Sequence, residues 1–321
     1  MLEAQKPAGT EKNLPPFSYE YYARSRNPQT GELVAFEPVN PIFELGIVKF
    51  DRGDVIHDVG AGTGGSTLNY RRFIPPEILP DVISIASEPS EESFNELKQN
   101  LGGCVQTYQL DGIKAVKSIN ANKVFLFHAI HLFSPKERVK FEKSVAGNLP
   151  DEGEHVLVTS FIEEDVPKEE QEVLIQPWMK FLFRRQLPQM GIDPRRILAK
   201  LKEQKLRMWK AEKYVRLVGK RLQVVYQSLN TMYCGLKSYE GINKYPVWIE
   251  HLLPGLDYET ASEALTKSLR TVWERIGREE ASVSPRNTLV IVAKKLPENG
   301  IVQQAEEAAK TAVDRELVTV A

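Results

Sequence analysis

Four glycines within six residues, at positions 60, 62, 64 and 65, constrain the fold of this chain most strongly. The apolar run that begins at Val55 leads into them, and residues 63–73 have the pattern of a helix. A strand that ends in glycines and continues as a helix surrounds a ligand with backbone N–H groups. Glycine has no Cβ, so the ligand can approach the main chain closely. The stretch predicts a site for a nucleotide-like cofactor, because a plain tight turn would not need four glycines.

Strands and helices alternate along the first half of the chain. Five apolar runs predict strands, and they lie at residues 55–59, 81–87, 104–110, 123–127 and 155–161. Helices are predicted at 40–50, 63–73, 90–101 and 134–147, with Ser90 and Ser134 as caps. This alternation predicts an α/β fold with a doubly wound, mostly parallel sheet.

The second half is mainly helical. Long helices are predicted at 169–189, 194–218, 245–253 and 258–276, and two further strands at 222–229 and 287–295. The sheet is therefore predicted to have seven strands, with a helical cap inserted after the fifth. The predicted divisions are a disordered N-terminus (1–16), a cofactor-binding core (17–163), a basic helical insertion or lid (164–221), the last strands with cap helices (222–296) and a flexible tail (297–321).

The glycine stretch fits two cofactor motifs. Gly60, Gly62 and Gly65 match the dinucleotide fingerprint G-x-G-x-x-G, which is weak evidence alone. The longer run D-V-G-A-G-T-G resembles motif I of the class I S-adenosylmethionine-dependent methyltransferases, acidic-x-G-x-G-x-G. That resemblance implies S-adenosylmethionine as cofactor, with Asp58 near its methionine amino group and Gly60, Gly62 and Gly64 around the sugar and amino acid. A dehydrogenase would also show a second βαβαβ half, which is not visible.

Two acidic residues follow later strands. Glu88 ends the second strand, where a carboxylate can accept hydrogen bonds from both ribose hydroxyls. This position fits a methyltransferase and an NAD enzyme equally well. Asp111 and Gly112 follow the third strand, and the resemblance implies that they contact the adenine. An ordinary Asp-Gly turn is the alternative for this pair.

Two histidines follow the fourth strand, at His128 and His131. The resemblance implies that this segment meets the methionine portion of the cofactor, so both are candidate catalytic residues, and His128 is also a candidate cofactor contact. Either could position the acceptor or take its proton, and a structural role is equally compatible. A metal site is disfavoured because no third ligand lies nearby in sequence.

Aromatic residues mark the segments that form the acceptor pocket in this superfamily. The resemblance implies that Tyr22, in a predicted N-terminal helix at 17–26, covers the cofactor. Most large rings belong to the core of a protein, so only some are expected to touch a ligand. The candidate acceptor-binding residues are Tyr19, Phe133, Trp178, Trp209, Tyr233, Trp248 and His251. So many rings favour a hydrophobic small molecule, such as a secondary metabolite, as acceptor.

Charge is unevenly distributed although the net charge is only −1. Residues 178–221 hold fourteen basic and three acidic residues, whereas 151–172 hold nine acidic residues and one lysine. Solvated helix faces that pair with each other explain this pattern most simply. An anionic substrate, a membrane surface or RNA are the alternatives, and the total charge does not favour nucleic-acid binding.

The remaining totals favour a cytoplasmic enzyme. No apolar run approaches the roughly 18 residues needed to span a bilayer, and the first residues lack the apolar region of a secretory signal. Two cysteines, Cys104 and Cys234, give no disulfide framework. The sequence thus predicts a small-molecule methyltransferase. An RNA or protein methyltransferase, and a scaffold retained for ligand binding or cyclisation, stay open, as does a homodimer.

Overall fold

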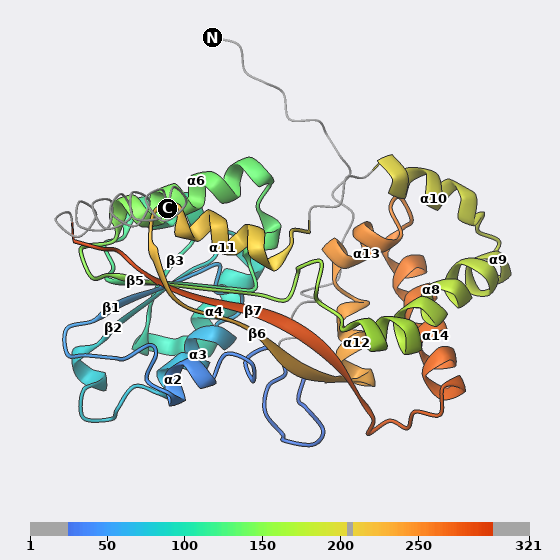
Figure 1. Cartoon of the computed structure of the whole chain (residues 1–321), viewed down its shortest axis with the longest axis horizontal. Coiled ribbons are helices and arrows are strands. Elements are labelled where there is room, and N and C mark those ends of the chain that lie inside the picture. Colours follow the sequence, from blue (N-terminus) through green and yellow to red (C-terminus); the bar gives the residue numbers. More distant parts are fainter. Residues whose placement is uncertain (1–24, 204–207, 298–321) are drawn as a thin grey trace, which may run out of the picture.

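The computed structural model describes residues 25–203 and 208–297. Seven strands form one sheet in the order β3-β2-β1-β4-β5-β7-β6 (Figure 1). The strands are β1 (Val55–Val59), β2 (Ile83–Ser87), β3 (Gln106–Tyr108), β4 (Lys123–Phe127), β5 (Glu154–Thr159), β6 (Gln223–Gly235) and β7 (Val283–Lys294). The first five are parallel, and β7 runs antiparallel to both β5 and β6. The predicted seven-stranded, mostly parallel α/β sheet is confirmed.

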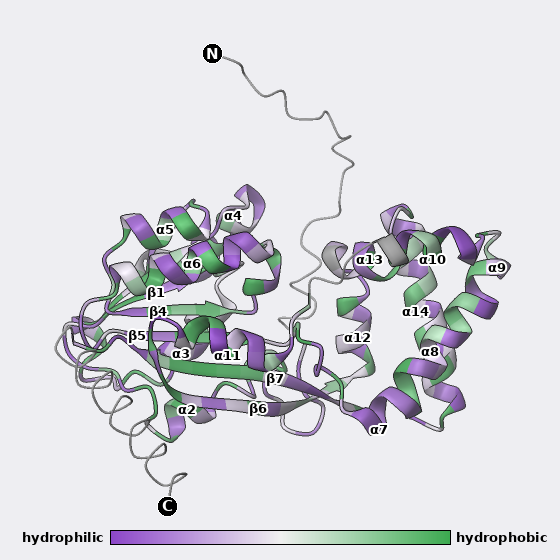
Figure 2. Ribbon diagram, turned by 45° about the horizontal axis from the view of Figure 1, so that its top comes forward, coloured by the Kyte–Doolittle hydropathy of each residue, from purple (hydrophilic) through white to green (hydrophobic). Residues whose placement is uncertain are grey.

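Helices cover both faces of the sheet. They are α2 (Pro41–Glu44), α3 (Gly65–Arg71), α4 (Glu91–Leu101), α5 (Gly112–Ser118), α6 (Pro135–Asn148) and α11 (Ala211–Gly219). One hydrophobic core joins α5, α6 and α11 to the sheet, and another joins α2 and α3 to the opposite face. Single 3-10 turns lie at Leu79–Asp81, Gly102–Cys104 and Ile130–Leu132. Strands β4 and β5 are buried along their whole length, as expected in the middle of a parallel sheet. Strand β4 is mainly hydrophobic (Figure 2).

A helical cap lies beyond one end of the sheet, next to the far ends of β6 and β7 (Figure 1). One part follows β5 and consists of α7 (Lys168–Glu170), a π-helical segment (Gln171–Ile175), α8 (Gln176–Phe181), a second π-helical segment (Leu182–Gln186), α9 (Leu187–Gln189) and α10 (Pro194–Glu203). The other part lies between β6 and β7 and consists of α12 (Leu236–Ile242), α13 (Pro246–Leu252) and α14 (Tyr258–Arg275). Trp178, Leu265 and Trp273 belong to a separate core within the cap.

Several predicted elements are wrong in extent. The single helix predicted at 194–218 is divided into α10 and α11, because Trp209 between them forms a β-bridge with Ile162 and packs on the sheet. The helix predicted at 40–50 is reduced to α2. The last two strands are longer than predicted, since the β6–β7 hairpin continues past the sheet to reach the cap. Across residues 25–203 and 208–297, none of the helices has the length and apolar character needed to cross a membrane.

Candidate functional site

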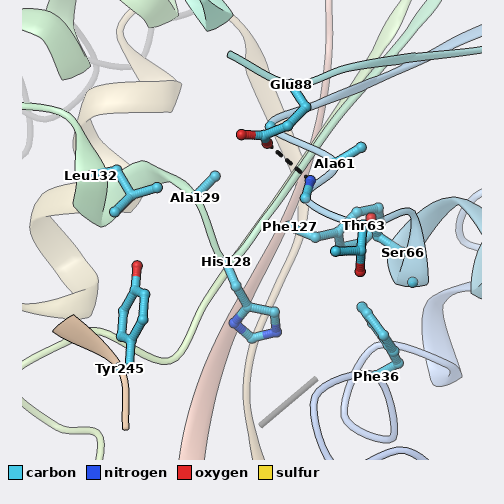
Figure 3. A pocket seen from close by; sticks show the side chains of 13 residues that line it. Phe36, Ala61, Thr63, Ser66, Glu88, Phe127, His128, Ala129, Leu132 and Tyr245 are labelled. Atoms are coloured by element: carbon cyan, nitrogen blue, oxygen red, sulfur yellow. Dashed lines mark hydrogen bonds between the residues drawn. The ribbon is translucent and has the colours of Figure 1, made fainter. Parts of the chain in front are cut away.

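A cavity opens at the carboxyl ends of β1 and β4, where the strand order of the sheet reverses. Ligands of open α/β sheets bind at this switch point. The cavity contains about 650 Å³ of empty space, part of it open to solvent. Its walls are formed by Phe36, Gly60, Ala61, Gly62, Thr63, Gly65, Ser66, Glu88, Phe127, His128, Ala129, Leu132 and Tyr245 (Figure 3).

The glycine turn forms one wall of this cavity. Gly60 and Gly64 have φ angles of 67° and 95°, in the left-handed region that other residues rarely adopt. A Cβ at Gly60 would lie 3.0 Å from the Ala129 side chain, and one at Gly64 would lie 3.0 Å from Leu101. Both positions therefore require glycine for conformation and for packing. Gly62 also has a positive φ, and its surroundings would leave room for a Cβ.

Glu88, the predicted ribose-binding residue, lies at the end of the second strand as the sequence indicated. It follows β2, lines the cavity and is only 8% exposed. One carboxylate oxygen accepts a hydrogen bond from the Gly62 N–H at 3.0 Å, and the other accepts one from the Ser90 N–H at 3.0 Å (Figure 3). Burial raises the pKa of this carboxyl, although these two bonds counteract it. Each oxygen still has lone-pair capacity for a further donor, so the residue fits a pair of ribose hydroxyls.

Asp58 lies behind the glycine turn and is not on the cavity wall. One of its oxygens accepts hydrogen bonds from the hydroxyls of Ser66 and Thr67, both at 2.6 Å. The other oxygen, Oδ1, is buried and has no partner among the described residues. Burial raises the pKa of Asp58 to about 6, against the two hydroxyl bonds, and the charge of Glu88 adds to the rise. An orphaned carboxylate oxygen beside the turn fits a nearby ammonium group, and Ser66 connects Asp58 to the cavity.

His128 is held in an unusual backbone conformation, with a φ of 52°. Its Nε2–H donates to the carbonyl of Ala35 at 2.9 Å, and Nδ1 lies 3.4 Å from the hydroxyl of Ser160. Burial lowers the pKa of His128 to about 4. The ring is therefore neutral near pH 7 and both of its nitrogens are engaged, which favours a structural role over that of a general base.

His131 joins the core to the cap. Its ring stacks on Phe161 with centroids 3.7 Å apart, and its Nε2 lies 3.2 Å from the hydroxyl of Tyr245, which lies between α12 and α13. Nδ1 is buried without a partner in the described part of the chain. Burial holds the pKa of His131 well below its usual value, and the charges of His128 and Arg138 contribute. A neutral His131 beside a cavity-lining hydroxyl is better placed than His128 to receive a proton.

Asp111 and Gly112 do not line the cavity. Asp111 is exposed and caps α5 by accepting a hydrogen bond from the Lys114 N–H at 3.0 Å. Gly112 is buried, and a Cβ there would lie 2.9 Å from the ring of Phe133. Its glycine identity thus follows from the packing of Phe133, and its contact with adenine stays a prediction, as does that of Asp111.

The predicted acceptor-binding aromatics are dispersed. Trp178 is buried in the cap core and donates to Ser268, whereas Trp209 is buried under α11 on the sheet. Tyr233 is 42% exposed on β6, and Trp248 and His251 pack near each other on α13. None of these, nor Phe133, is among the residues that line the cavity. Tyr19 and Tyr22 lie outside the described residues, so all these roles stay predictions.

Among the cavity residues that were not candidates from the sequence are four large apolar or aromatic ones: Phe36, Phe127, Leu132 and Tyr245. Phe127 ends β4 and Leu132 follows it, so their places relative to the strand could have indicated them. Phe36 and Tyr245 come from a loop and from the cap, and no local pattern marks them. Tyr245 and Leu132 lie across the cavity from Thr63 and Ser66 (Figure 3).

Among the described residues, no ion pair joins the two charged stretches as the sequence suggested. Asp165 and Glu170 of the acidic stretch pair instead with Arg286 and Arg278 near β7. Several basic residues of the cap are exposed and form no ion pair with another described residue: Lys180, Arg184, Arg185, Arg195, Arg196 and Lys200. Within the described ranges, no group of three or more His, Cys, Asp or Glu side chains could hold a metal ion.

No protein-family model and no curated protein matches the chain. Solved structures do. Cyclopropane synthase MmaA2 from Mycobacterium tuberculosis is 12% identical, with a TM-score of 0.47 over 86% of this chain and 93% of that one. Mycolic acid cyclopropane synthase CmaA1, solved with SAH and CTAB, is 12% identical, with a TM-score of 0.49 over 86% and 93%. The [4+2]-cyclase SpnF is 12% identical, with a TM-score of 0.46 over 85% of each chain.

The strand order and strand directions of the chain are those of a Rossmann-like methyltransferase fold. Five parallel strands are followed by the β6–β7 hairpin, in which the antiparallel β7 lies between β5 and β6.

Proposed function

We propose that this protein is an S-adenosylmethionine-dependent methyltransferase that acts on a hydrophobic small molecule. The proposal is supported by one cavity whose two sides differ in chemical character. On one side are the glycine turn and the Glu88 carboxylate, which suit a nucleoside. Opposite them are Leu132 and Tyr245, and the rings of Phe36 and Phe127 add apolar surface on the side of Thr63 and Ser66, which suits an apolar acceptor (Figure 3).

Each residue on the nucleoside side has a definite task in this proposal. Glu88 accepts hydrogen bonds from both ribose hydroxyls, and Gly60 and Gly62 allow close approach of the main chain. Asp58, behind the cavity wall, holds the Ser66 hydroxyl in place, and its negative charge favours an ammonium group near that wall. When bound, S-adenosylmethionine supplies a methyl group on an electrophilic sulfonium.

The acceptor side of the cavity contributes by holding the acceptor close to the methyl group. An in-line displacement needs the acceptor atom at near-attack distance and water excluded, and the apolar walls provide both. A base is needed only if the acceptor atom keeps a proton of high pKa. In that case the proton passes to His131 through the Tyr245 hydroxyl, which donates its own proton to Nε2 of His131 as it accepts the other, because both nitrogens of His128 are already engaged.

The exposed basic residues of the cap favour a second candidate, methylation of RNA. Phosphate contacts give binding that weakens steeply with salt. Reversing Arg195 and Arg196 to Glu removes two of these charges, and reversing Lys220 and Arg221, exposed just after α11, is the matched control. We expect no salt-sensitive RNA binding in wild type. Tight binding that is lost only in the Arg195 and Arg196 variant would favour the RNA candidate.

Transfer of a labelled methyl group tests the proposed function. The protein is incubated with trideuteriomethyl S-adenosylmethionine and a panel of hydrophobic phenols, amines and quinols, and separately with total RNA. The proposal expects the label in a small molecule, and less transfer by the Glu88→Ala variant at low S-adenosylmethionine concentration. Label in RNA, or S-adenosylhomocysteine binding with no transfer to any acceptor, would contradict it and favour the RNA or the scaffold alternative.

A further inference from the structure

The loop between β4 and α6, residues 128–134, shapes the acceptor side of the cavity. His128, Ala129 and Leu132 line the cavity, and His131 contacts the cavity-lining Tyr245. Leu132 is 53% exposed, so its own packing does little to fix it. The wall of the cavity therefore depends on what holds this loop.

Arg138, in α6, reaches back to the carbonyls of the loop. Its Nε donates to the carbonyls of Ile130 and Phe133 at 3.1 and 3.0 Å, and a terminal nitrogen lies 3.4 Å from that of His131. The side chain is completely buried, which is very rare for an arginine. Burying a guanidinium is costly unless its N–H groups are satisfied, and here the loop carbonyls accept from two of them, the Nε–H and one terminal N–H.

Two rings from α11 and the segment just before it, on the same face of the sheet, hold the guanidinium in place. Its carbon lies 4.8 Å from the ring centre of Trp209 and 5.5 Å from that of Tyr214. A planar guanidinium combines stacking on rings with hydrogen bonds in its own plane, which an ammonium cannot do. Trp209, Arg138 and the loop thus form a continuous chain of contacts from α11 to the cavity wall.

Phe133 provides a second anchor for the loop. Its ring lies over Gly112, where a Cβ would approach to 2.9 Å, and its centroid is 5.2 Å from that of Phe141. This contact fixes the end of the loop but not its middle. The carbonyls of residues 130 and 131 are held by Arg138.

We propose that Arg138 is a positioning residue, which fixes the segment 130–133 through its carbonyls and so sets the placement of Leu132 and His131 at the cavity. Its role in acceptor turnover rests on the proposed function, whereas its role in holding the loop does not. The groups that face His131 are His128, Arg138, Tyr245 and Phe161. Arg138 also contributes to keeping His131 neutral, since its positive charge lowers the pKa of that ring.

Hydrogen exchange measures the loop directly. Arg138→Lys keeps the charge but lacks the planar fork, and Arg138→Met removes both. In each variant we expect the amides of Leu132 and Phe133 to exchange at least roughly tenfold faster than in wild type, with no change in β4. Arg278→Met, which removes a partly buried guanidinium from the cap, is the control and should leave these amides unchanged. Unchanged loop exchange in a folded Arg138→Lys protein would overturn the proposal.

Turnover gives a second readout, which a general loss of stability would not reproduce. For Arg138→Lys we expect kcat to fall at least about tenfold while KM for S-adenosylmethionine changes less than about threefold. Equal kcat values would overturn the role in turnover. If the wild-type protein does not bind S-adenosylhomocysteine, the proposed function fails, and the exchange experiment still decides the role of Arg138 in the loop.

Discussion

Replacing Asp58 by Asn tests the account of the buried carboxylate. The carboxamide has the same shape, and its oxygen can still accept hydrogen bonds from Ser66 and Thr67. The substitution removes the negative charge of the carboxylate and leaves an amide group at the position of the unpartnered oxygen. Asp58 is completely buried, so the full effect of the charge is felt by the fold.

The size of the effect follows from the pKa of Asp58, which burial raises from 3.8 to about 6. One pKa unit corresponds to about 1.4 kcal/mol, so the charge costs about 3 kcal/mol of stability well above pH 6. The folded state binds the proton more tightly than the unfolded state, so this cost is absent below pH 3.8 and grows as the pH rises through about 6. In the Asp58→Asn variant an unpartnered amide costs about 1 to 3 kcal/mol at every pH.

Urea unfolding at pH 5 and pH 8 separates the two contributions. Because the amide cost does not depend on pH, it cancels in the comparison. Relative to wild type, the Asp58→Asn variant is expected to be about 1.5 kcal/mol more stable against unfolding at pH 8 than at pH 5. The variant should also bind S-adenosylmethionine more weakly. A relative stability that is the same at both pH values would refute this reasoning.

Three further predictions concern single residues. Glu88→Ala should weaken S-adenosylmethionine binding by about 1.5 to 3 kcal/mol, as expected for charge-assisted bonds to ribose, and calorimetry that gives wild-type affinity in a folded variant would exclude that role. His128→Gln should lower kcat by less than about 100-fold and keep the pH–rate profile, because both ring nitrogens are engaged, and a flattened profile with intact cofactor binding would identify it as a base. For His155, burial alone would lower the pKa, but the charge and hydrogen bond of Glu142 raise the pKa above 6.5. The stability that His155 contributes is therefore present below pH 6.5 and lost as the pH rises through the raised pKa. His155→Gln should therefore cost more stability at pH 6 than at pH 9, and an equal cost in thermal unfolding at both would contradict the sign.

Local patterns in the sequence were sufficient to predict the sheet. The continuous apolar run at 123–127 could only be a strand buried on both faces, and Ser134 followed by Pro135 marked the start of α6. The helix predicted at 194–218 failed because the periodic pattern does not show that Trp209 pairs with Ile162, more than forty residues earlier in the chain. A tertiary contact of this kind overrides local helix propensity.

The residues of the candidate site likewise include some that the sequence could predict and some that it could not. Glu88 and the glycine turn were predictable because their places relative to β1 and β2 fix where they lie. Tyr245 and Phe36 were not, because each reaches the cavity from a segment whose position is set by long-range packing. Composition also misled, since aromatic residues such as Trp178 and Trp209 complete the cores of cap and sheet and lie away from the cavity wall.

Calorimetric titration with S-adenosylhomocysteine tests the central claim, that the glycine turn and Glu88 form a cofactor site of the methyltransferase type. The wild-type protein is expected to bind one equivalent saturably, and Glu88→Ala is expected to bind it at least roughly tenfold more weakly, as the loss of hydrogen bonds to ribose implies. A parallel titration with NAD is expected to give no heat. Saturable NAD binding, or no heat with S-adenosylhomocysteine in a folded wild-type protein, would contradict the account.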